Sequence, residues 1–147
     1  MKKTILGTAL LFFIMLGAHA QKSEVYVTDG KAIKGYDAVA FFTSSRPVRG
    51  ADNLSYNWKG ADWLFSSQKN LEAFKSNPEK YAPQYGGYCA YGASKGKKAP
   101  IQVDTWTVAN GKLYFNYNMD VKEMWAKDRD GCIKKADENW PKIKDKE

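Results

Sequence analysis

The chain has 147 residues, a formal net charge of +7 and a hydrophobic content of 44%, which is enough apolar material for one small globular domain. Its single histidine, His19, lies in an N-terminal stretch that we expect to be cleaved. A mature chain without histidine excludes a Ser-His-Asp triad, a Cys-His pair and any metal site built on imidazole.

The first twenty residues have the pattern of an export signal. Two lysines open the segment, residues 4–17 form an apolar run too short to span a bilayer comfortably, and an A-x-A cleavage site ends at Ala20. We therefore expect a signal peptide over residues 1–20, cleavage after Ala20 and a periplasmic or secreted domain over residues 21–147. Loss of the two lysines lowers the net charge from +7 to +5, and the mature chain has no transmembrane segment.

The next part of the chain favours short strands. Residues 24–28 predict an edge strand that ends at an Asp-Gly turn. The apolar run over residues 35–42 contains one carboxylate, Asp37, which we expect to cap a helical turn or to accept hydrogen bonds from nearby backbone N–H groups. Residues 43–53 have the composition of a loop.

A hairpin and a helix follow this loop. Apolar residues alternate with polar ones over residues 54–58, which predicts a half-buried strand, and a tight turn returns the chain as a partner strand over residues 62–65. Ser66 or Ser67 is expected to cap a helix that ends near Ser76.

Residues 77–92 are the densest stretch in special residues, with two prolines, four tyrosines and one of the two cysteines. Asn77 and the proline after it predict a single helical turn. Gly86 and Gly87 permit backbone conformations that other residues avoid. A second short helix beginning directly after them would place Cys89 in its first turn.

Two interpretations of Cys89 stay open. A thiol at a helix N-terminus, with lysines close behind it at positions 95, 97 and 98, would have a lowered pKa and could be a catalytic redox group. Alternatively, Cys89 is a small buried hydrophobe, which is the usual state of a free cysteine. A disulfide with Cys132 is allowed in an exported protein, and the spacing of the two cysteines neither requires nor excludes it.

The aromatic residues also have two interpretations. The tyrosines of the central stretch, with Trp58 or Trp63 nearby, could line a pocket for a small apolar or cationic ligand. In the other interpretation these rings form the core of a small domain with few aliphatic residues. The candidate ligand-binding residues come from the apolar run over residues 35–42 and from residues 77–92. They are Asp37, Tyr85, Gly86, Gly87 and Tyr88.

The C-terminal part predicts a second hairpin and a helical end. Asn-Gly at positions 110–111 separates two β-rich runs and is a strong hairpin signal. Asp120 with Glu123 has the pattern of a capping box, and apolar residues then recur near the helical period. We expect a break or kink at Gly131, and we expect Cys132 to pack in the core.

The motifs together resemble a known family. Residues 54–81 are similar to the YHS domain, and the flanking runs over residues 35–42 and 81–90 resemble a longer group of secreted YHS-domain proteins. Metal-binding relatives of this domain carry cysteines in a Phe-Cys-Ser-x-x-Cys pattern. The matching positions here are Ser66 and Asn70, which are poor ligands for soft metals.

The sequence therefore predicts a single α+β domain with two antiparallel hairpins, in one sheet or two, packed with several short helices. The resemblance implies an exported YHS-type binding or accessory module, acting on a small ligand or an envelope protein, rather than a self-sufficient enzyme. A thiol-based redox protein using Cys89 is one alternative. A metal-binding protein, which would have to use Cys89, Cys132, Met119, Met124 and carboxylates, is another. No cofactor and no nucleic acid partner are expected.

Overall fold

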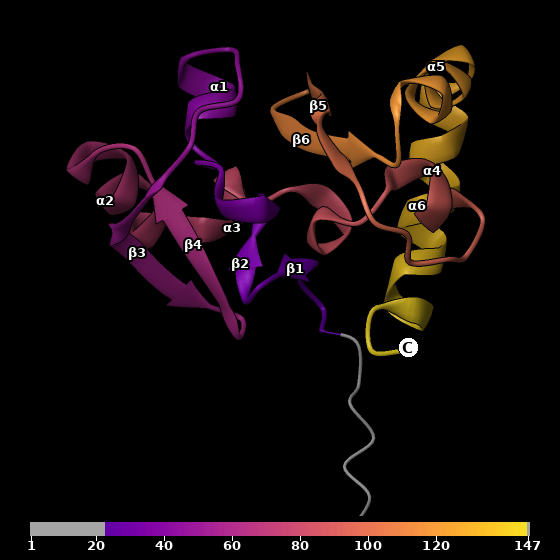
Figure 1. Cartoon of the computed structure of the whole chain (residues 1–147). Helices are drawn as coiled ribbons and strands as arrows, with labels where there is room; N and C mark the ends of the chain where they lie inside the picture. Colours follow the sequence, from indigo (N-terminus) through magenta and orange to yellow (C-terminus); the bar gives the residue numbers. More distant parts are fainter. Residues whose placement is uncertain (1–22, 147) are drawn as a thin grey trace, which may run out of the picture.

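Two groups of elements lie side by side in the computed structural model, which describes residues 23–146 (Figure 1). The first group holds a four-stranded sheet and short helices, and the second holds a two-stranded hairpin and the longest helix of the described part. The predicted α+β class is therefore confirmed. The predicted signal peptide, its cleavage site and His19 lie outside the described residues.

The four-stranded sheet is built around the predicted first hairpin. Its spatial order is β1 (Val27–Thr28), β2 (Lys31–Ala32), β4 (Ala61–Phe65) and β3 (Ala51–Trp58). The β3–β4 pair is antiparallel, whereas β2 runs parallel to β4 at a single pair of residues. β1 is shorter than the predicted strand, and β3 begins within the predicted loop.

Three short helices complete the first half. They are α1 (Ala40–Thr43), α2 (Gln68–Ser76) and α3 (Pro78–Tyr81). The side chain of Ser67 caps α2 as expected, by accepting a hydrogen bond from the Asn70 amide at 3.1 Å. α2 buries Leu71 and Phe74. Asn77 occupies the N-cap position of α3 as expected, although its side chain accepts no capping bond.

The chain crosses to the second half through the 3₁₀ helix η2 (Gln84–Gly87) and then enters α4 (Ala90–Ser94). Tyr85, Gly86 and Gly87 all have positive φ, at 58°, 62° and 84°. A β-carbon on Gly86 would lie 1.8 Å from the carbonyl oxygen of Glu24, so only glycine fits there. This close approach lets the Gly86 carbonyl accept a hydrogen bond from the Tyr26 amide at 2.9 Å.

The second half begins with the predicted Asn-Gly hairpin. β5 (Gln102–Ala109) pairs antiparallel with β6 (Lys112–Asn116) in a sheet of its own, so the single-sheet option is wrong. α5 (Met119–Lys127) and α6 (Arg129–Ile143) follow.

Two details of these C-terminal helices differ from prediction. The side chain of Asn118, and not an Asp120 capping box, caps α5. The chain breaks at Asp128 rather than at Gly131, because the Asp128 carboxylate accepts from the Gly131 amide and so begins α6.

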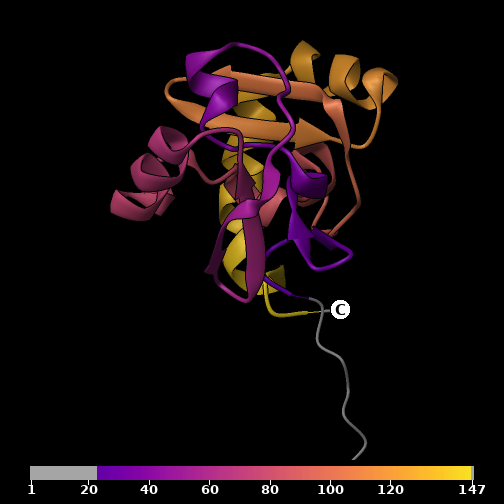
Figure 2. The same cartoon turned by 60° about the vertical axis from the view of Figure 1, so that its left-hand side comes forward.

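A hydrophobic core joins the two halves. Phe41 of the first half meets Phe115 of the second edge to face, with ring centroids 5.3 Å apart. A second cluster lies between the β5–β6 hairpin and α6, and Figure 2 shows the hairpin lying across one end of that helix. No helix among residues 23–146 is long and apolar enough to cross a membrane.

Candidate ligand-binding cleft

A cleft of about 220 Å³ opens where the two halves meet. The end of β3, β4, α3 and the turn at Tyr85 form one side, and α6 forms the other. Four aromatic side chains line it and are Trp58, Trp63, Tyr85 and Trp140. A concave apolar site with a few polar groups at a junction of this kind is the usual form of a small-molecule site.

The aromatic walls are fixed by specific contacts. Trp58 and Trp63 meet edge to face with centroids 5.6 Å apart, and the Trp63 indole N–H donates to the Trp58 carbonyl at 3.0 Å. Across the cleft, Tyr85 and Trp140 meet edge to face at 6.0 Å. Because each ring is held by a neighbour, the cleft is formed before any ligand arrives.

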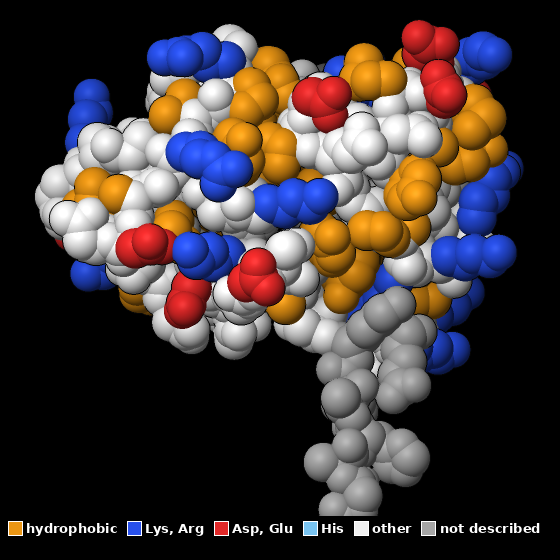
Figure 3. All heavy atoms as spheres, viewed as in Figure 1, with side chains coloured by type: hydrophobic (Ala, Val, Ile, Leu, Met, Phe, Trp, Pro, Cys, Tyr) orange, Lys and Arg blue, Asp and Glu red, His pale blue; other side chains and the backbone are white. Residues whose placement is uncertain are grey.

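Charged groups stand at the rim of these walls. The Lys59 ammonium lies 3.1 Å from a Glu24 carboxylate oxygen, 3.6 Å from one of Glu79 and 4.7 Å from the centroid of the Trp58 ring. Asp137 adds a third carboxylate. Three carboxylates and one ammonium group give the cleft a formal charge of −2. On the face of the protein seen in Figure 3, by contrast, Lys and Arg side chains are spread over both halves.

Tyr85 connects the two sides of the cleft. Its hydroxyl donates to the Asp137 carboxylate at 2.9 Å, and α6 is thereby tied to the central turn. Burial raises the pKa of Tyr85, and the hydrogen bond to Asp137 and the charge of that carboxylate raise the pKa further. Tyr85 consequently keeps its proton and remains a donor to Asp137 across the physiological range.

The remaining residues predicted to bind a ligand lie in different places. Gly86 lines the cleft with Tyr85, whereas Gly87, Tyr88 and Asp37 are not among the cleft residues. Tyr88 is buried, and its hydroxyl donates to the Ser23 carbonyl at 2.8 Å. Burial raises the pKa of the Tyr88 hydroxyl.

Cys89 is held inside the protein, with 1% of its surface exposed. It occupies the N-cap position of α4, where its sulfur accepts from the Gly92 amide at 3.4 Å and its S–H donates to Asn116 Oδ1 at 3.6 Å. Burial raises the pKa of the thiol more than the hydrogen bonds from backbone amides lower it. Of the two interpretations, the one with a lowered thiol pKa is therefore wrong, and Cys89 is buried as in the other.

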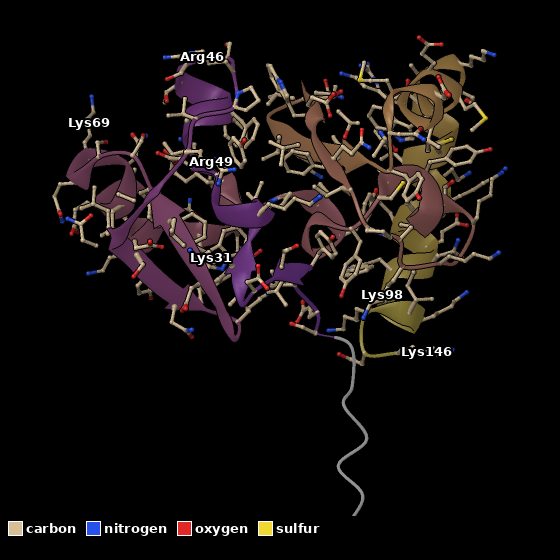
Figure 4. The ribbon with its side chains drawn as sticks, viewed as in Figure 1. Lys31, Arg46, Arg49, Lys69, Lys98 and Lys146 are labelled. Carbon is tan, nitrogen blue, oxygen red and sulfur yellow. The ribbon has the colours of Figure 1, made fainter. Side chains whose placement is uncertain are left out.

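The expected partners of Cys89 are engaged elsewhere. Both cysteines are free and buried, so Cys89 and Cys132 form no disulfide. The Lys95 ammonium lies over the ring of Tyr91. Lys98 reaches the C-terminal end, where it lies close to Lys146 (Figure 4), and it donates to the Lys146 carbonyl at 2.9 Å.

Asp37 is the centre of a buried polar cluster outside the cleft. One carboxylate oxygen accepts from the amides of Val39 and Ala40, at 2.9 and 3.2 Å, as expected for a local cap. The other accepts from the Ser66 amide at 2.8 Å, the Ser66 hydroxyl at 2.6 Å and the Asn70 side-chain amide at 2.8 Å. Asp37 therefore links the start of α1 to the end of β4 and to α2.

The comparisons with known proteins identify one segment. Residues 42–85 match the YHS domain. A search of curated proteins and a search of solved structures each gave no match. The YHS segment supplies Trp58, Lys59 and Trp63 to the cleft, while Asp137 and Trp140 come from the C-terminal helix outside it.

The residues of this YHS segment do not suit a soft metal ion. Ser66 and Asn70, which the resemblance matches to the cysteines of metal-binding relatives, direct their hydrogen-bond donors at Asp37. Among residues 23–146, no three His, Cys, Asp or Glu side chains are grouped so that they could hold a metal.

Sequence reasoning missed half of the cleft. In the sequence, Lys59 belongs to the tight turn after residues 54–58 and Trp140 to the apolar helical pattern near the C-terminus, and neither pattern indicates a ligand site. Asp137 had no signal at all, because a single aspartate on a charged helix resembles any other exposed residue. Outside residues 77–92, the sequence pattern indicates only Trp58 and Trp63 as possible lining residues, and both line the cleft.

Proposed function

We propose that this chain is an exported YHS-type binding module, and that its ligand site is the cleft between the YHS segment and α6. The observation that carries this proposal is the pre-formed aromatic lining of the cleft. Both sides are needed, because Trp58 and Trp63 lie on one side and Trp140 on the other. A binding role suits a cleft with no serine, threonine, cysteine or histidine among its lining residues.

Tyr85 supports the same role through its backbone. A bulky residue with φ of 58° is strained, and such strain is characteristic of ligand sites, where the surrounding structure holds it in place. Here the strain aims the ring at the cleft wall and its hydroxyl at Asp137.

Three probes of similar size test the cleft, namely benzylamine, benzyl alcohol and benzoate. We expect at least one to bind, with a change in tryptophan fluorescence, because Trp58, Trp63 and Trp140 all line the site. Glu79→Trp should block binding, since Glu79 is an exposed rim residue of the cleft. Glu72→Trp, at an exposed position of α2 away from the cleft, is the matched control. Equal binding by both variants would place the ligand elsewhere.

Export is the second part of the proposal. It is supported by the charged start, the apolar run and the A-x-A site of the first twenty residues. Expression of the full chain in a Gram-negative host, followed by N-terminal sequencing of the periplasmic fraction, should give a chain that begins at Gln21. Ala20→Leu should leave the longer form, because the cleavage site accepts small residues. Recovery of only uncleaved cytoplasmic protein would contradict export.

The thiol-based alternative has less support. A redox cysteine needs a solvent-accessible sulfur with a lowered pKa, and burial gives Cys89 neither property. Alkylation with iodoacetamide at neutral pH, followed by mass spectrometry, tests this point directly. We expect Cys89 to react only as fast as the protein opens. Rapid alkylation of Cys89 in the folded protein would revive the redox alternative.

A further inference from the structure

The cleft differs in charge from the rest of this basic protein. The chain carries a net charge of +7, yet Glu24, Glu79 and Asp137 line the cleft against a single ammonium group, that of Lys59. Aromatic walls add to the effect, because the face of an aromatic ring is the negative end of its quadrupole. The cleft is therefore a local site for positive charge on a protein that otherwise repels cations.

Lys59 already shows how this site holds an ammonium group. Its nitrogen lies over the Trp58 ring at 4.7 Å and within 3.1 and 3.6 Å of Glu24 and Glu79. A cation placed on an aromatic face and flanked by carboxylates is the arrangement by which proteins recognise organic ammonium ligands. The Lys59 ammonium thus occupies the charged end of the cleft, where an organic ammonium ligand would bind.

The Lys59 side chain is able to leave this position. Lys59 lies with Gly60 in the hairpin turn, at φ of 50° and 73°, so its flexible stem extends from a loop tip. The side chain is 35% exposed, and its partner carboxylates on Glu24 and Glu79 are 32% and 75% exposed. Ion pairs this exposed are screened by water and contribute little, so a ligand can replace them at low cost.

We propose that the cleft binds a small organic ammonium ion, which replaces the Lys59 ammonium between Glu24 and Glu79. This inference rests on the proposed function of the cleft as a ligand site. The ammonium group would lie over Trp58, with the apolar part of the ligand directed at Trp63, Tyr85 and Trp140. A cleft of about 220 Å³ has room for a small organic ammonium ion.

Choline and its neutral isostere 3,3-dimethyl-1-butanol test the charge requirement, because they share one shape and differ only in the central atom. Isothermal titration of the purified protein should show choline binding about tenfold more tightly than the isostere. Added salt should weaken choline binding and leave the isostere unaffected. Equal affinity for the two compounds would overturn the ammonium inference.

Lys59→Met tests the replacement step. Removal of the competing internal cation should tighten choline binding by about threefold or more, since the ligand no longer has to displace it. Lys75→Met is the matched control, because Lys75 also lies over an aromatic ring, that of Tyr56 at 5.7 Å, but away from the cleft. Unchanged or weaker choline binding by Lys59→Met would show that Lys59 does not occupy the ligand position.

The outcomes separate the two proposals. If choline fails to bind but benzyl alcohol binds in a manner sensitive to Glu79→Trp, the cleft remains the ligand site and the ammonium class is wrong. If neither choline nor any of the three benzyl probes binds, the proposed function itself fails. Thermal unfolding of each variant, compared with the unaltered protein, ensures that a lost signal reflects the cleft and not loss of the fold.

Discussion

Gly86 is the position where the backbone leaves least room for a side chain. A β-carbon there would lie 1.8 Å from the Glu24 carbonyl oxygen, and the residue has φ of 62°. Gly86→Ala should therefore destabilise the protein by more than about 2 kcal/mol, because it combines backbone strain with a clash against main-chain atoms. Urea unfolding measures this loss directly.

Gly111 provides the control for this substitution. Its φ of 72° is as unfavourable for alanine, but a β-carbon there would meet nothing within 4 Å. Gly111→Ala should cost about 1 kcal/mol, which is the conformational part alone. Equal losses at the two positions would show that the N-terminal segment moves away from Gly86 without cost.

Cys89 gives a prediction about pH. Burial raises the pKa of its thiol, so the folded protein holds this proton more tightly than the unfolded chain does. The resulting stability is complete below the ordinary thiol pKa and is lost as the pH rises through the folded-state value. The free energy of unfolding should therefore fall as the pH rises above the ordinary thiol pKa of about 8.5.

The variant Cys89→Ala isolates this effect. Tyr85, Tyr88 and Tyr114 also have raised pKa values through burial, and they destabilise the folded state at still higher pH in both proteins. The loss of stability that begins near the thiol pKa should be smaller in the variant than in the unaltered protein. Parallel pH profiles for the two proteins would contradict a raised pKa at Cys89.

The elements of the first half depend on Asp37 for their arrangement. Its buried carboxylate accepts hydrogen bonds from α1, from Ser66 at the end of β4 and from Asn70 in α2. Asp37→Asn would turn an amide group toward two or more of these donors. We expect a loss of about 3 kcal/mol, because buried donors would lose a charged acceptor and meet another donor.

Asp52→Asn is the control for this change. Asp52 pairs with Lys31 at 2.7 Å, but its side chain is 82% exposed, so its removal should alter stability by less than about 1 kcal/mol. Urea midpoints of the two variants make the comparison. Equal stability of Asp37→Asn and Asp52→Asn would mean that the polar cluster does not hold the three elements together.

The sequence predicts best those helices, strands and turns that depend on residues close together in the chain. The Asn-Gly turn, the alternation in β3 and the Ser67 cap each depend on residues within a few positions of one another. The parallel contact of β2 with β4 and the link from Asp37 to Ser66 join residues that are about thirty positions apart. No spacing or composition reports such pairings, because tertiary packing alone decides them.

For the cleft, too, the sequence indicates residues by their local pattern, whereas the contacts of its charged residues join distant parts of the chain. The sequence indicates Tyr85 and Gly86 as candidate binding residues, because their stretch is rich in tyrosine and glycine, and both line the cleft. Asp137 lies 52 positions from the Tyr85 hydroxyl that it accepts from, and Glu24 lies 35 positions from Lys59. The charge of the cleft therefore emerges only when the N-terminal segment, the YHS segment and α6 are folded together.

The two ends of the described chain are joined by one lysine. Lys98 donates to the carbonyl of Ser23 at 3.3 Å and to the carbonyls of Lys144 and Lys146, and its ammonium lies 5.1 Å from the centroid of the Tyr88 ring. Because Lys144 and Lys146 directly follow α6, a cation at their carbonyls is also favoured by the negative end of the helix dipole. The N-terminal segment and α6, which both line the cleft, are thus held to a common point.

Lys98→Met should loosen both ends together. We expect a loss of about 1–2 kcal/mol and faster amide hydrogen exchange in residues 23–26 and in the last turn of α6, because one side chain serves both segments. Lys97→Met, an exposed neighbour, is the control and should change neither. Faster exchange at only one end would show that the ends are held independently. Faster exchange at both ends, with weaker binding of the cleft probes, would show that this lysine also stabilises the ligand site.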